Sequence, residues 1–93
     1  MYKTKVLLNS LDKVRRFINI VSHFDDVDMD ICCGRYIVDA KSIMGILSMS
    51  LTTPLELRIN AQDKHLKEIL DEIAEFEYKE EIKFEPAIKE FAV

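Results

Sequence analysis

Few side chains in this chain of 93 residues have the type and spacing that acid–base, nucleophilic or metal chemistry requires. Its two histidines, His23 and His65, cannot supply the three imidazoles of a three-histidine metal centre. Its two cysteines, Cys32 and Cys33, are adjacent, so they form neither a C-x-x-C motif nor a disulfide framework. We expect one thiol in the core and one partly exposed, in a reduced, cytoplasmic protein. No spacing defines a catalytic triad, so the sequence predicts no enzyme.

The run Asp26-x-Asp28-x-Asp30 has the opening spacing of a calcium-binding loop. The sixth position of that loop requires glycine and the twelfth glutamate, and here they are Ile31 and Ile37. Strict alternation with apolar residues instead indicates a strand whose carboxylates face water. We therefore predict no metal site and no cofactor.

Two polar side chains, Asp12 and Ser42, stand where helical patterns begin. A carboxylate or hydroxyl there can accept a hydrogen bond from an unpaired backbone N–H, so both are predicted to be N-caps. Aspartate can also act as a nucleophile toward phosphoryl groups. It normally needs a metal for this, and no companion acidic cluster accompanies Asp12.

The elements that position these side chains follow from the hydrophobic periodicity. Period-two or β-rich segments predict strands at residues 3–8, 26–31, 35–38 and 55–60. Helical spacing predicts helices from residue 14 to about 24, over 43–50, and from a cap at Asp63. The last helix is expected to be the longest, with an apolar stripe of Leu66, Ile69, Leu70, Ile73 and Ala74.

The predicted order is β-α-β-β-α-β-α in an α+β fold. Each strand has one apolar face, which favours a four-stranded antiparallel sheet with three helices on that face. The ferredoxin-like split βαβ arrangement is the nearest alternative. We assign residues 1–78 to this domain and residues 79–93, which contain Pro86, to a C-terminal extension.

Composition restricts the partners. The formal net charge is −4, so the chain has no general attraction for nucleic acid. No apolar run approaches the roughly 20 residues of a membrane span, and none resembles a signal peptide. With 48% hydrophobic residues, we expect a soluble globular domain.

Residues 41–51, which read Lys-Ser-Ile-Met-Gly-Ile-Leu-Ser-Met-Ser-Leu, resemble the serine-site helix of HPr. HPr is the small phosphocarrier of the bacterial sugar phosphotransferase system, and the resemblance is greatest to its Gram-positive versions. The order of elements also matches over residues 2–78. The resemblance implies the open-faced β-sandwich of HPr.

HPr carries its phosphoryl group on a histidine at the start of its first helix. In the corresponding stretch, Ser10 to Arg15, Asp12 stands at the histidine position and Val14 at that of the phosphate-holding arginine. The resemblance therefore implies an HPr-like regulatory or protein-interaction domain without histidine phosphocarrier activity. The alternatives are a phosphocarrier with an atypical acceptor, Asp12, and a small enzyme or ligand-binding module.

The resemblance also implies that Ser42 is a regulatory phosphorylation site, because the matching serine of Gram-positive HPr is modified by HPr kinase/phosphorylase. The alternative is that Ser42 only caps its helix.

A docking surface is implied at the same end of the molecule. Its expected residues are Lys13, Arg15, Arg16, Lys41, Ile43, Met44 and Leu47. Met44 is equally compatible with the core, and the basic residues with a solvated helix face. The implied partners are a phosphotransferase-system component, HPr kinase/phosphorylase or a catabolite regulator. The sequence predicts no oligomeric state.

Overall fold

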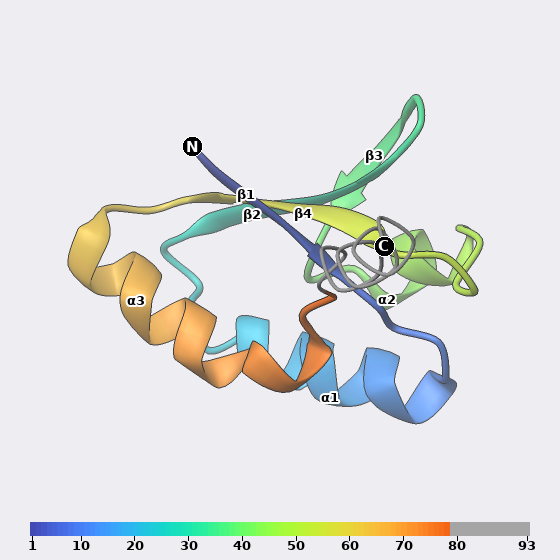
Figure 1. Cartoon of the computed structure of the whole chain (residues 1–93), viewed down its shortest axis with the longest axis horizontal. Helices are drawn as coiled ribbons and strands as arrows, with labels where there is room; N and C mark the ends of the chain where they lie inside the picture. Colours follow the sequence, from blue (N-terminus) through green and yellow to red (C-terminus); the bar gives the residue numbers. More distant parts are fainter. Residues whose placement is uncertain (79–93) are drawn as a thin grey trace, which may run out of the picture.

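A computed structural model describes residues 1–78 (Figure 1). Its strands are β1 (Tyr2–Val6), β2 (Asp28–Cys33), β3 (Tyr36–Asp39) and β4 (Leu55–Asn60). Its helices are α1 (Leu11–Val21), α2 (Ile43–Leu47) and α3 (Asp63–Glu72), followed by the 3-10 turn η1 (Ala74–Phe76). The predicted extension, residues 79–93, lies outside the described residues.

The four strands form one antiparallel sheet in the order β1-β4-β2-β3. Alternate residues of each strand point to the same face, and α1 and α3 lie together on one side of the sheet (Figure 1). Buried side chains from all the helices, such as Phe17, Ile46 and Ile69, join those of the strands in one core. The predicted HPr-like α+β fold is confirmed.

The end of the described chain is fixed to both layers of the fold. The ring of Phe76 packs edge-on against Phe17 of α1, with 5.6 Å between the ring centroids. The Phe76 carbonyl accepts a hydrogen bond from the Leu7 amide (2.8 Å), and Glu77 forms a bridge with Val6 of β1. The sequence did not predict this role of Phe76.

The second predicted helix, residues 43–50, is too long. α2 ends at Leu47, and the Ser48 hydroxyl donates to the Gly45 carbonyl (2.6 Å). A side chain that engages a helix carbonyl in this way competes with the backbone ladder. α2 packs closely on β3, because a Cβ at Gly45 would lie 2.9 Å from the Cβ of Val38.

The start and end of the last helix also differ from expectation. Gln62 is the N-cap of α3 and makes no side-chain capping bond, while Asp63 is the first helical residue. α3 has 10 residues and is shorter than α1, which has 11. The tighter η1 turn then directs Phe76 into the core, so Ala74 is exposed rather than part of the buried stripe.

The strand boundaries shift by two residues or fewer from those predicted. Leu8 lies beyond the end of β1, yet it is fully buried. Val27, Met29 and Ile31 are buried as expected, although β2 begins only at Asp28 and continues to Cys33.

The two cysteines point to opposite faces of β2. Cys33 is half-buried and packs against the core, whereas Cys32 is buried on the face that the helices leave open. Burial raises the pKa of the Cys32 thiol above its ordinary value, so the thiol is protonated at neutral pH. On the same face, Arg58 donates to Glu56 (2.7 Å) and lowers the pKa of that carboxyl.

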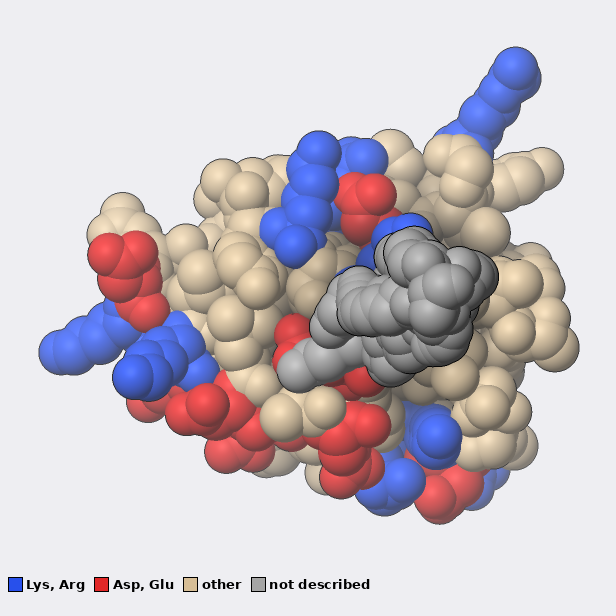
Figure 2. Space-filling view, viewed as in Figure 1, with Lys and Arg blue, Asp and Glu red and all other residues tan. Residues whose placement is uncertain are grey.

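Acidic side chains gather along α3 on the face shown in Figure 2. In residues 1–78, no helix is both long enough and apolar enough to cross a membrane.

Candidate functional site

The first turn of α1 is capped by Ser10, not by Asp12. Ser10 has an extended backbone (φ −152°, ψ 156°), and its hydroxyl oxygen accepts a hydrogen bond from the Lys13 amide (3.1 Å). Asp12 is already a helical residue, so the predicted cap was wrong by two positions. An N-cap residue has a non-helical backbone, and its side-chain oxygen accepts a hydrogen bond from the amide of the second or third helical residue. Of Ser10 and Asp12, only Ser10 meets both conditions.

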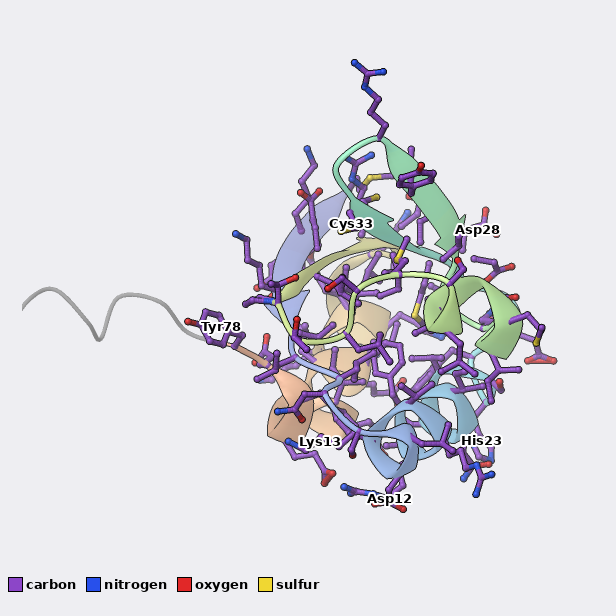
Figure 3. All side chains as sticks on the ribbon, turned by 90° about the vertical axis from the view of Figure 1, so that its right-hand side faces the viewer. Asp12, Lys13, His23, Asp28, Cys33 and Tyr78 are labelled. Carbon is purple, nitrogen blue, oxygen red and sulfur yellow. The ribbon has the colours of Figure 1, made fainter. Side chains whose placement is uncertain are left out.

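Asp12 instead forms an ion pair along the helix. Its Oδ2 accepts from Nε of Arg16 (3.1 Å), one turn further on, and its side chain is 79% exposed. Asp12 projects away from the body of the protein at the start of α1 (Figure 3).

Arg16 joins α1 to η1. Besides Asp12, its guanidinium binds Glu75 of η1 and stacks over the Phe76 ring, 5.5 Å from the centroid. The hydrogen bonds to Asp12 and to Glu75 raise the pKa of Arg16. The charge of this predicted docking residue is therefore paired with two carboxylates.

Val14 is fully buried in the core. This is the position at which the resemblance to HPr expects a phosphate-holding arginine. Val14 therefore supplies a core contact at this position and no charge to hold a phosphate.

The start of α2 confirms Ser42 as a helix cap. The Ser42 hydroxyl oxygen accepts from the Gly45 amide (3.2 Å), and its own backbone is extended. The side chain is half-buried at the edge of the exposed surface.

The apolar side chains that follow Ser42 divide between core and surface. Ile46 is fully buried, whereas Met44 is 75%, Leu47 41% and Ile43 38% exposed. Met44, which the sequence left open between core and docking, is therefore a surface residue.

An open groove of about 350 Å³ runs between α1 and α2. Its lining residues are Arg15, Ile18, Asn19, Ser22, Lys41 and Ile43. Three of the predicted docking residues, Arg15, Lys41 and Ile43, thus line it. Leu11, 48% exposed and one helical turn before Arg15, adds an apolar side chain that the sequence did not single out. We call Leu11, Arg15, Ile43, Met44 and Leu47 the α1–α2 face.

The other predicted basic residues lie on another side of α1 or, like Lys41 at the groove, have an engaged charge. Lys13 and Arg16 lie three residues apart on α1, on the side of the helix that Arg16 turns toward η1. Lys41 uses its ammonium group to bind the carbonyls of Phe24 (2.8 Å) and Val27 (2.9 Å), and so secures the loop between α1 and β2. Of the four basic residues, only Arg15 is both exposed and part of the α1–α2 face.

Neither histidine lies near Asp12. Asp12 lies in the first turn of α1, and His23 follows the last turn. The helix between them is about 15 Å long at the usual rise per residue. His65 belongs to α3, where Nε2 is 3.9 Å from Asp26 Oδ1 and the ring packs edge-on to Phe24. In the described part of the chain, no group of three or more His, Cys, Asp or Glu could hold a metal ion.

Comparison with models of known protein families identifies the family to which this chain belongs. The family model described as "PTS HPr component phosphorylation site" matches residues 13–77. The chain belongs to the HPr family. It is a phosphocarrier-like domain of the phosphotransferase system, and members of this family bind other proteins of that system. The match begins at Lys13, one residue after Asp12.

A solved structure shows the same fold. The crystal structure of HPr-C-His from Thermoanaerobacter tengcongensis is 23% identical and superposes with a TM-score of 0.61. The similarity covers 80% of this chain and 92% of that one. No curated protein matches the chain.

Replacing Ser10 should destabilise the protein more than replacing Asp12. Ser10→Ala removes the cap of α1 and should lower the free energy of unfolding by about 1 kcal/mol. Asp12→Ala removes only an exposed ion pair and should cost less. Urea denaturation of both variants measures the difference, and a larger loss for Asp12→Ala would contradict the capping assignment.

Proposed function

We propose that this HPr-family domain binds protein partners through the α1–α2 face and does not carry a phosphoryl group on histidine. The observation that carries this proposal is the replacement at the start of α1. The resemblance to HPr places the family's phosphorylated histidine at Asp12 and its arginine at Val14. Val14 is a fully buried core residue, and Asp12 is an exposed residue of the first helical turn.

The chemistry of Asp12 supports the loss of transfer. Imidazole is a neutral nucleophile near pH 7, whereas a carboxylate repels an incoming phosphate. Phosphoryl transfer to aspartate normally requires a metal ion to neutralise that charge. Here the partner of Asp12 is Arg16, which already pairs with Glu75. Arg16 therefore already binds two carboxylates.

The α1–α2 face supports partner binding. Large exposed apolar side chains at the centre of a surface and a polar rim are typical of interfaces, and methionine adapts to more than one partner. Arg15 supplies a positive charge at the rim. We propose as partners a phosphotransferase-system component, HPr kinase/phosphorylase or a catabolite regulator, in the cytoplasm.

We further propose Ser42 as a phosphorylation site that regulates this binding. A phosphate on an N-cap can accept hydrogen bonds from the first backbone amides of the helix. Ser42 precedes Ile43 and Met44, so its phosphate would bring negative charge to the edge of the α1–α2 face. The Lys41 ammonium is held by the loop carbonyls, so we assign the charge of Lys41 no direct role in binding that phosphate.

The protein should not accept phosphate from phosphoenolpyruvate. Incubation with enzyme I and labelled phosphoenolpyruvate should leave it unlabelled under conditions that label an active HPr. Label that is stable to gel analysis, or that hydroxylamine releases as from an acyl phosphate, would contradict the proposal. Loss of that label in Asp12→Asn would establish the alternative, an atypical phosphocarrier.

Charge reversal at Arg15 or polar substitution at Met44 should weaken partner binding by about tenfold or more. An effect of this size is typical when an interface loses a side chain that is well buried in the complex. Titration calorimetry measures the dissociation constant of each variant with purified enzyme I, HPr kinase/phosphorylase and the catabolite regulator. Lys67→Glu on the exposed side of α3 is the control for Arg15→Glu, because it changes the net charge equally. Equal effects of the two variants on every partner that binds would contradict the proposed face.

Treatment with HPr kinase/phosphorylase and ATP should add one phosphoryl group to the peptide that contains Ser42. Mass spectrometry should detect it in the wild type and in Ser48→Ala, at the other end of α2, but not in Ser42→Ala. An unmodified chain beside a fully modified Gram-positive HPr would contradict the assignment.

A further inference from the structure

β3 is one of the two edge strands of the sheet and presents large apolar side chains to solvent. It pairs only with β2, and no other strand of residues 1–78 lies along its outer edge. Tyr36 is 74% and Ile37 57% exposed. The β2–β3 hairpin, which turns at Gly34 (φ +61°), extends beyond the helices (Figure 1). An exposed edge of this kind is a template for pairing with another strand.

The hydrogen-bonding groups of β3 alternate between β2 and solvent. The Ala40 amide donates to the Met29 carbonyl (3.0 Å), so the backbone groups of Ala40 face β2. In an antiparallel ladder, every second residue does the same, which directs Tyr36 and Val38 inward as well. The backbone groups of Arg35, Ile37 and Asp39 therefore face outward.

We propose that this edge pairs with the β3 edge of a second copy of the chain, antiparallel and about a two-fold axis at Ile37. In this register, Ile37 exchanges both backbone hydrogen bonds with Ile37 of the second copy. The outward-facing groups of Arg35, Ile37 and Asp39 then meet outward-facing groups of the second copy, although the Asp39 carbonyl also accepts from the Ser42 amide. Two four-stranded sheets thereby become one continuous sheet.

The side chains are complementary in the same register. Arg35 lies opposite Asp39 of the second copy, and the two-fold axis makes this charge pair twice. On the face that carries the helices, Tyr36 lies opposite Val38 of the second copy, an aromatic and β-branched pair. Both kinds of cross-strand pair stabilise antiparallel sheets.

The neighbouring registers lack this complementarity. An axis at Tyr36 would place Arg35 opposite Ile37, and an axis at Val38 would place Asp39 opposite Ile37. In each of these registers, a charged side chain lies opposite Ile37, and Arg35 and Asp39 of the two copies do not pair. The charges at the two ends of β3 therefore select the register centred on Ile37.

The contact is short, so the association is weak and concentration-dependent. β3 has only four residues, and the Asp39 carbonyl already accepts the Ser42 amide (3.0 Å). We expect sedimentation equilibrium of the full chain to show a reversible monomer–dimer equilibrium. As the dimer forms, the amide NMR signals of Arg35, Ile37 and Asp39 should shift more than those of Tyr36 and Val38.

Two complementary charge variants test the register. Arg35→Asp places two acidic residues opposite each other at both ends, and Asp39→Arg does the same with two basic residues. Each variant alone should dimerise at least about tenfold more weakly than the wild type, since both charge pairs become repulsive. Mixed in equal amounts, the two should form a heterodimer, because both pairs are then attractive.

Lys3→Glu on β1, at the opposite edge of the sheet, is the control for Arg35→Asp because both change the net charge by the same amount. The Asp39 carboxylate also accepts a hydrogen bond from the Lys41 amide (2.9 Å), so Asp39→Arg removes a contact within the fold. Circular dichroism therefore checks that each variant is folded. If Asp39→Arg unfolds, Ile37→Lys replaces it and should abolish the dimer by placing two lysines at the axis. A chain that stays monomeric at millimolar concentration, or a dimer unaffected by Arg35→Asp or Ile37→Lys, would overturn the proposal.

Discussion

The packing of Phe76 against Phe17 is the contact on which the arrangement of this domain depends. The sheet has one apolar face, and both α1 and η1 contribute side chains to the core on that face. Phe76 supplies the apolar part of that contact, and Arg16 adds a cation over the same ring together with a bond to Glu75. The position of α1 in turn places Leu11 and Arg15 beside α2. The surface proposed for partner binding is thus set by a core contact behind it.

Period-two and helical spacing predicted the order of elements, because burial on one face imposes these periods on each strand and helix. Ser42 was also predictable, since a serine before an apolar helical run has few other local uses. The contacts that the sequence did not reveal join residues far apart in the chain. Phe76 stood in a charged segment, and its burial depends on a 3-10 turn that no periodicity announces.

The candidate site was less predictable than the fold for the same reason. Asp12 and Ser10 are both acceptable caps by residue type, and only the backbone conformation distinguishes them. Lys41, adjacent to Ser42, was expected to face a partner, yet its ammonium binds two loop carbonyls instead. One of the two adjacent cysteines was expected in the core and the other partly exposed. Cys33 does point to the core but is only half-buried, while Cys32 is buried on the opposite face of the sheet. Distances along the sequence cannot show which long polar side chain will meet which backbone group.

The bonds made by Lys41 also separate two residues that look like one motif. Lys41 and Ser42 are neighbours in the chain, but the lysine stabilises the loop after α1 while the serine caps α2. A change at residue 41 would alter the entry into β2 before it altered recognition of the serine. Lys41 and Ser42 are therefore under independent structural constraints, and the fold alone gives a reason for a lysine at residue 41 whether or not the serine is modified.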